Sequence, residues 1–236
     1  MKVVAILQAR MNSTRLPGKM LFDLAGAPLV QRVVERAQRA TSIHEVVVAF
    51  PIKDYESFKC LHSTGCSLYA SPGAENDLVG RYLSAADAYS ADIIVRIPCD
   101  NPCVQPGIID AAVERYLHTP SLYVSTMYHH LHDRVYADGL GAEVLSMSRL
   151  KWLDQKTVGQ ANYREHPHLL FQDWHLIDGW EQYQRYANHS ETILLDVNTM
   201  DDYEFIRDIY EALYPANPLF TIDDILAYLA RKKVTA

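Results

Sequence analysis

The chain opens on the stretch that decides the expected fold: Met1-Lys2-Val3-Val4-Ala5-Ile6-Leu7-Gln8-Ala9-Arg10-Met11-Asn12-Ser13-Thr14-Arg15-Leu16-Pro17-Gly18-Lys19. Residues 3–7 form a continuous apolar run, which is typical of a strand buried on both faces of a parallel sheet. In open α/β sheets, ligands bind at the carboxyl ends of such strands. The loop at residues 8–19 is therefore expected beside a ligand site.

This loop is locally basic. It carries Arg10, Arg15 and Lys19, and no Asp or Glu precedes position 23, although the whole chain has a formal net charge of -7. The local positive charge favours a polyanionic ligand such as a phosphate, and Ser13 adds a hydroxyl donor. Solvated surface charge is the alternative explanation for these cations. The loop matches neither the P-loop pattern nor the dinucleotide fingerprint.

The rest of the chain alternates strand and helix patterns. Strands are expected at residues 3–7, 45–49, 67–70, 92–97, 123–126 and 192–197. Helices are expected at residues 28–40, 55–64, 78–89, 106–116 and 203–213, with a final helix capped by Thr221 and Asp224. This alternation predicts a doubly wound, mostly parallel α/β sheet with right-handed crossovers. A single domain spanning residues 1–236 is expected.

Residues 128–190 break the alternation. They hold most of the ten histidines and show no clean periodicity. We expect an irregular insertion that lines a site or an interface. A zinc site among these histidines is disfavoured, because their spacing does not follow patterns such as H-E-x-x-H.

Composition narrows the class of protein. The chain is 49% hydrophobic and 22% charged, which is ordinary for a globular protein. No apolar run approaches the roughly 20 residues that cross a bilayer, and no signal peptide is recognisable, so a cytoplasmic protein without a membrane partner is expected. The acidic balance, without a basic stripe, argues against nucleic acid as a partner. The four cysteines are expected to be free thiols, because a cytosolic chain of this size does not need disulfides, and their spacing misses the usual zinc pattern.

Further motifs follow the basic loop in a fixed order. They lie at residues 77–82, 94–102, 136–140, 164–166 and 196–202. Together with the loop, which is the most specific of them, they resemble the cytidylyltransferases that activate acidic sugars. That family includes CMP-KDO and CMP-sialic acid synthetases and the spore coat polysaccharide synthesis proteins of the SpsF type. The resemblance covers nearly the whole chain.

The resemblance implies a nucleotide-diphospho-sugar transferase-like fold and Mg²⁺-dependent attack of a sugar hydroxyl on the α-phosphate of CTP. Pyrophosphate is the expected leaving group. A triphosphate repels an attacking oxygen until cations neutralise it, so the resemblance implies Arg10 and Lys19, together with Asp100 as a metal ligand, as the expected catalytic residues. The expected nucleotide contacts are Gln8, Ala9, Arg10, Ser13, Arg15, Lys19, Asp77 and Arg81.

The expected metal ligands are Asp100, Asp196 and Asn198. Mg²⁺ prefers hard oxygen ligands, and Asp100 follows an apolar strand at its carboxyl end. A turn or N-cap is the alternative role for Asp100. Residues two apart in a strand face the same side, so Asp196 can lie beside Asn198 at the end of the expected strand at 192–197. The family places an aspartate where this chain has Asn198, so weaker metal binding or a one-metal site stays open.

Acceptor contacts are expected within the insertion. Asp138 and Glu143 could hydrogen-bond sugar hydroxyls, and Arg134, Arg164 and His166 could hold a carboxylate or phosphate. A surface hairpin with scattered charges is the alternative. Family members commonly dimerise through this insertion, which implies a homodimer.

The sequence therefore predicts transfer of CMP from CTP to an acidic sugar or similar small acid in surface polysaccharide or glycan synthesis. Transfer to a sugar phosphate or phosphonate is one alternative. A catalytically weakened nucleotide-binding scaffold is another, which Asn198 makes conceivable. Glycosyl transfer is disfavoured, because Asp100-Asn101-Pro102 is not a D-x-D metal motif.

Overall fold

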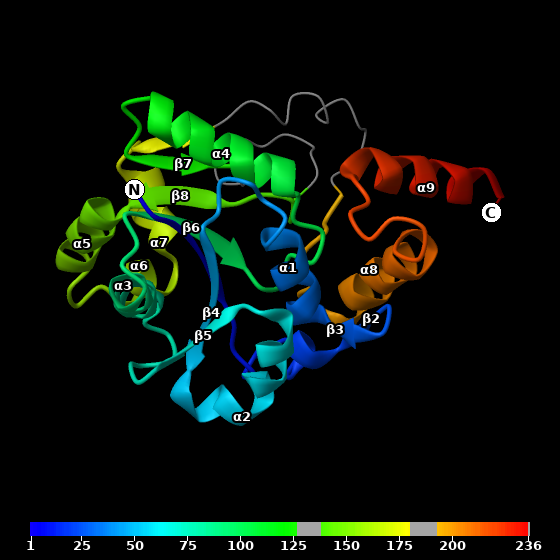
Figure 1. The fold of residues 1–236 in the computed structure, drawn as a ribbon, viewed down its shortest axis with the longest axis horizontal. Coiled ribbons are helices and arrows are strands. Elements are labelled where there is room, and N and C mark those ends of the chain that lie inside the picture. The colour runs from blue at the N-terminus through cyan, green and yellow to red at the C-terminus, as the bar shows by residue number, and fades with distance from the viewer. Residues whose placement is uncertain (127–137, 180–192, 236) are drawn as a thin grey trace.

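The computed structural model describes residues 1–126, 138–179 and 193–235 (Figure 1). Within these residues, a seven-stranded sheet has the order β5-β4-β1-β6-β8-β7-β9. Its strands are β1 (Val3–Gln8), β4 (Glu45–Pro51), β5 (Ser67–Ser71), β6 (Ile93–Pro98), β7 (Tyr123–Ser125), β8 (Glu143–Ser146) and β9 (Ile177–Gly179). β8 runs antiparallel to β6 and β7, and the other neighbouring pairs are parallel. The predicted mostly parallel sheet is confirmed.

Helices cover both faces of the sheet, as the unbroken apolar pattern of residues 3–7 predicts. Along β1, Val3, Ala5 and Leu7 point into one core, and Val4 and Ile6 point into the other. The first core is closed by α1 (Leu29–Ala37), α4 (Pro106–His118) and α8 (Met200–Leu213). The second is closed by α3 (Leu78–Ala88), α5 (Met147–Lys156) and α7 (Pro167–Asp173) (Figure 1).

The remaining elements are short or peripheral. They are β2 (Asp23–Leu24) paired with β3 (Ala27–Pro28), α2 (Tyr55–Phe58), α6 (Ala161–Glu165), α9 (Ile222–Thr235) and 3₁₀ turns at Lys19–Leu21, Ile52–Asp54 and Lys59–Thr64. The helix expected at residues 55–64 is thus α2 between two 3₁₀ turns. The predicted cap of the last helix is confirmed, because Thr221 and Asp224 exchange hydrogen bonds.

The strand expected at residues 192–197 is wrong for its described part, where only Ile193 forms a bridge. The carbonyl of Ile193 accepts from Asp138 N at 2.9 Å, and Val197 N donates to the carbonyl of Asp100 at 2.8 Å. The backbone partners of this segment are therefore loop residues instead of a neighbouring strand. These bonds still bring residues 196 and 198 to the carboxyl end of β6.

The expected irregularity of residues 128–190 is also wrong for the described residues 138–179. They form β8, α5, α6, α7 and β9. These elements are short, and too few residues recur in each to reveal a period. Ser146, for example, caps α5 by accepting from Arg149 N at 3.2 Å, and Leu150 and Leu153 bury its inner face. Residues 128–137 and 180–190 of the predicted insertion lie outside the described residues.

The cysteines are free, as expected: Cys60 is exposed and Cys66, Cys99 and Cys103 are buried. Among the helices of the described residues, none combines the length and apolarity that a membrane crossing requires.

Candidate active site

A cavity of about 350 Å³ lies where β1 and β6 end. Gln8 and Pro98 are register partners at the end of the β1–β6 ladder, so the segments that follow the two strands emerge side by side. The predicted site residues that line this cavity are Gln8, Arg10, Arg15, Asp100, Asp138, Glu143, His166, Asp196 and Asn198. The cavity therefore lies at the edge of the sheet where the sequence predicts a ligand site.

The basic loop is shaped by its own backbone. Gly18 has φ of 73°, which favours glycine, and its N–H donates to the carbonyl of Met11 at 3.0 Å. The hydroxyl of Ser13 accepts from Leu16 N at 3.3 Å, and Ala9 is fully buried. Ala9 and Ser13 therefore support the loop without lining the cavity, and their predicted nucleotide contacts stay predictions.

Each cation of the loop contacts an oxygen at the site. Arg10 Nη1 donates to Asn76 Oδ1 at 3.0 Å and lies 3.5 Å from Glu165 Oε1. Arg15 Nη2 donates to Asn198 Oδ1 at 2.6 Å. Both guanidinium groups line the cavity, where they can meet an anionic ligand.

Lys19 is placed differently from the two arginines. It is only 6% exposed and does not line the cavity. Its Nζ donates to Asp100 Oδ2 at 2.7 Å and to the carbonyl of Val197 at 2.6 Å. Lys19 therefore joins the loop after β6 to the segment at residues 196–198. Its predicted role on the leaving phosphates stays a prediction.

Carboxylates gather opposite these cations. Asp100, Asp138 and Asp196 all line the cavity. Burial raises the pKa of Asp196 to about 6, and the negative charges of Asp138 and Asp100 add to the rise. Asn198 Nδ2 donates to Asp196 Oδ2. The residues that the structure describes contain no group of three His, Cys, Asp or Glu arranged around a metal position.

A glycine permits this crowding of carboxylates. Gly139 has φ of 79°, and a Cβ at this position would lie 2.6 Å from the carbonyl carbon of Leu195 and 2.9 Å from Asp196 N. Only a residue without a side chain allows the backbone beside Asp138 to come so close to the backbone beside Asp196.

The floor of the cavity is a buried ion pair between Arg96 and Glu143, which are register partners on β6 and β8. Arg96 Nη1 also donates to the hydroxyl of Tyr123 at 3.0 Å, and the guanidinium carbon lies 4.8 Å from the ring centre of Tyr82. Within the described structure, Arg96 Nε and Glu143 Oε1 are buried without a hydrogen-bond partner. Buried polar atoms without a partner are uncommon, so these two atoms mark the floor as an unusual feature of the fold.

The structure does not bring Asp77, Arg81 and Arg164 to the cavity wall. Asp77 caps α3 by accepting from Gly80 N at 2.9 Å and pairs with Arg164 at 2.8 and 2.9 Å. Burial raises the pKa of Asp77, but Arg164 outweighs it and the net shift is downward. Arg81 is buried and donates to the carbonyl of Glu75 at 2.7 Å. The predicted ligand contacts of these three residues stay predictions.

Arg134, another predicted acceptor residue, lies outside the described residues. Sequence reasoning missed several cavity residues, namely Leu78, Tyr82, Arg96, Pro98, Asn101, Glu165 and His168. Arg96 carried a usable signal: a single charge in the middle of a buried strand needs a partner or a ligand. Glu165 lies between the predicted residues Arg164 and His166, and this position also indicated a place near the site.

The fold and the cavity together define a ligand-binding protein of the mostly parallel α/β class, with cations after β1 and the carboxylate of Asp100 after β6. The chain belongs to the cytidylyltransferase family, whose match covers residues 4–226. The predicted family is thereby confirmed, and with it a nucleotidyltransferase fold and activity class.

Individual relatives agree with this assignment. The chain is 33% identical over 180 residues to the 3-deoxy-manno-octulosonate cytidylyltransferase of Trichlorobacter lovleyi, which covers 70% of this chain and 71% of the relative. It is 24% identical over 216 residues to the spore coat polysaccharide biosynthesis protein SpsF of Bacillus subtilis, covering 89% and 86%. In two other 3-deoxy-manno-octulosonate cytidylyltransferases the match spans 51% and 50% of the relative.

Solved structures show the same fold. A cytidylyltransferase from Leptospira borgpetersenii superposes with a TM-score of 0.86 at 25% identity, over 99% of this chain and 96% of the other. A CMP:2-keto-3-deoxy-manno-octonic acid synthetase complexed with CTP superposes with a TM-score of 0.67 at 17% identity, over 89% and 99%.

Proposed function

We propose that the protein transfers CMP from CTP to a small acidic sugar or a similar acid, with release of pyrophosphate, in surface polysaccharide or glycan synthesis. The observation that carries this proposal is the cavity that joins Arg10 and Arg15 to Asp100 and Asp196, in a chain of the cytidylyltransferase family. The names of the relatives support the acidic acceptor, since they include 3-deoxy-manno-octulosonate cytidylyltransferases and SpsF.

In this reaction an acceptor hydroxyl oxygen forms a bond to the α-phosphorus while the bond to the bridging oxygen breaks. The electron pair of that bond leaves with pyrophosphate, and the proton of the acceptor hydroxyl passes to water. Arg10 and Arg15 bind the phosphates and stabilise the charge that moves onto the leaving group. Lys19 holds Asp100 in place through its 2.7 Å contact. The floor of the cavity, formed by Arg96 and Glu143, receives polar groups of the acceptor.

Mg²⁺ is the proposed cofactor, and the donor set fits it. Asp100 and Asp196 offer carboxylate oxygens, Asn198 an amide oxygen, and the shared negative charge around Asp196 favours a cation. Mg²⁺ usually takes one or two carboxylates and completes its shell with phosphate oxygens and water, so a group of three acidic ligands is unnecessary. When bound, the ion supplies positive charge beside the reacting phosphate.

Pyrophosphate release tests the proposal. The purified protein is incubated with CTP, Mg²⁺ and a panel containing 3-deoxy-manno-octulosonate, N-acetylneuraminate, a sugar phosphate and a phosphonate. We expect pyrophosphate with CTP and an acidic sugar, little with UTP or ATP, and a large loss in the Asp100→Asn variant. Turnover only with the sugar phosphate or phosphonate would replace the proposed acceptor class. Absence of turnover with every nucleotide would reject the enzyme activity.

We also propose that the protein is a cytoplasmic homodimer. The need for CTP supports the cytoplasmic location. Family members that the chain resembles commonly dimerise through the insertion that corresponds to residues 128–190, which supports the homodimer. Light scattering at micromolar concentration tests the dimer, and a mass near the monomer value of 26.8 kDa would contradict it.

A further inference from the structure

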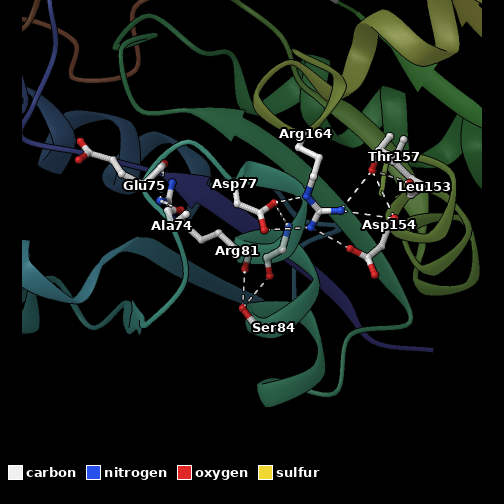
Figure 2. A network of polar contacts seen from close by, with 10 residues as sticks. Ala74, Glu75, Asp77, Arg81, Ser84, Leu153, Asp154, Thr157 and Arg164 are labelled. Carbon is white, nitrogen blue, oxygen red and sulfur yellow. Dashed lines mark hydrogen bonds and ion pairs between the residues drawn. The ribbon is translucent and has the colours of Figure 1, made fainter. Parts of the chain in front are cut away.

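Arg164 joins three helices through one guanidinium group (Figure 2). Its Nε and Nη2 donate to the two carboxylate oxygens of Asp77 at 2.8 and 2.9 Å. Nη2 also donates to Asp154 Oδ1 at 2.9 Å, and Nη1 lies 3.3 Å from Thr157 Oγ1. This side chain, which belongs to α6, therefore contacts the start of α3 and the end of α5. A two-pronged contact of this kind fixes orientation as well as distance.

Asp77 is held for this contact from the other side. Its Oδ1 caps α3 through Gly80 N at 2.9 Å. A Cβ at Gly80 would lie 2.5 Å from Asp77 Oδ2, so the glycine makes room for the carboxylate. The loop before it, residues 72–77, is anchored as well, because Arg81 Nη2 donates to the carbonyl of Glu75 at 2.7 Å.

The sequence neighbours of this ion pair converge on one atom. Asn76 precedes Asp77, and Glu165 follows Arg164. Asn76 Oδ1 lies 3.0 Å from Arg10 Nη1, and Glu165 Oε1 lies 3.5 Å from the same nitrogen. Arg10 lines the cavity, whereas Arg164 and Asp77 do not. The ion pair thus fixes the spacing of the two side chains that hold Arg10.

We propose that Arg164 is a positioning residue that, together with Asp77, sets the guanidinium of Arg10 for the phosphates of the nucleotide. The inference rests on the proposed binding of CTP. It gives Arg164 and Asp77 a role outside the ligand contacts that the sequence predicted for them.

A double-mutant cycle tests the proposal. Calorimetric titration with CTP in the presence of MgCl₂ is carried out on the wild-type protein, Arg164→Lys, Arg10→Ala and the double variant. Lysine cannot form the two-pronged contact, so we expect the Kd for CTP to rise about tenfold in Arg164→Lys. In the Arg10→Ala background, the same substitution is expected to change Kd by less than about twofold, because its target is gone.

A second variant separates positioning from general stability. Gly80→Ala displaces the carboxylate of Asp77 without changing any charge. The higher helix propensity of alanine offsets the weakened cap of α3, so the melting temperature should change little. We expect its Kd for CTP to rise as in Arg164→Lys. Asp110→Asn is the matched control, because Asp110 bonds Thr41 and Ser42 away from the cavity. It should lose stability and keep its affinity for CTP.

The outcomes divide cleanly. If Arg164→Lys and Arg10→Ala multiply their effects on Kd, Arg164 acts independently of Arg10 and the inference fails while the proposed function stands. Wild-type affinity in both Arg164→Lys and Gly80→Ala also overturns it. A wild-type protein that does not bind CTP overturns the proposed function, and this inference with it.

Discussion

Replacing Lys19 by Met removes the cation behind the active site while keeping a side chain of similar length. Lys19 Nζ bonds Asp100 Oδ2 at 2.7 Å and the carbonyl of Val197 at 2.6 Å. The Lys19 side chain is 7% exposed and that of Asp100 is 28% exposed. The variant leaves Asp100 without its counter-ion beside Asp196, so we expect a loss of stability as well as of activity.

The magnitude follows from the bonds that are lost. Both lost bonds are donated by the charged ammonium of Lys19, and a hydrogen bond to a charged group contributes about 1.5–3 kcal/mol. Water reaches the partly exposed Asp100 in the variant and recovers part of this, which leaves about 2 kcal/mol. For a domain of this size, 1 kcal/mol shifts the melting temperature by about 2–4 °C, so a fall of about 4–8 °C is expected.

Urea unfolding of the wild-type protein, Lys19→Met, Asp100→Asn and the double variant measures the coupling. Because each single change leaves a charge unpaired and the double change leaves none, the double variant should be more stable than the sum of the single effects by about 1–2 kcal/mol. Effects that add within about 0.5 kcal/mol would show that the contact does not couple the two residues, and would refute the reasoning.

Three further predictions concern stability. Burial raises the pKa of Asp110, but hydrogen bonds from Ser42 and Thr41 outweigh it and hold the pKa below its usual 3.8. The contribution of these bonds to stability is complete above that value and disappears as pH falls through the folded-state pKa. In urea unfolding, Asp110→Asn should therefore be less stable than the wild-type protein by about 1–2 kcal/mol at pH 7 and equally stable in acid. An equal loss of stability in acid would contradict this. Gly139→Ala should lower the melting temperature by several degrees, about the effect of 1–3 kcal/mol of backbone strain, and an unchanged value would mean that the backbone relaxes. Glu143→Ala leaves the buried guanidinium of Arg96 unpaired and should cost about 3–5 kcal/mol in urea unfolding, whereas a loss below about 1 kcal/mol would show that the pair is not needed.

The fold could be predicted where apolar patterns were long. The run at residues 3–7 and the spacing of the helix at residues 78–89 gave β1 and α3, and strand order then placed the basic loop beside Asp100. The strand prediction failed at residues 193–197, because an apolar stretch buried by loops has the same composition as one buried in a sheet. β8 was missed because it is short and carries Glu143, whose partner Arg96 lies far away in the sequence.

The candidate site was predictable in its location and in part of its acidic and basic residues, but the pairings were not. Nothing in the sequence shows that Lys19 turns inward to Asp100, or that Arg164 turns toward Asp77 instead of the cavity. Such choices depend on which charged groups the fold brings within reach, and each burial must be matched by a partner. The sequence thus gives the set of charges, and the tertiary structure decides which of them meet the ligand.

Because β8 runs opposite to β6 and β7, the residues around the cavity come from segments of two kinds. The first residue of β8, Glu143, pairs with Ser125 at the end of β7. β7 therefore ends, and β8 begins, at the end of the sheet where the cavity lies. The parallel strands β1 and β6 carry the loops with Arg10 and Asp100, whereas β8 brings Glu143. We therefore expect residues at the start of β8 to vary with the acceptor, while the loops after β1 and β6, which carry the residues proposed to bind the nucleotide, stay the same.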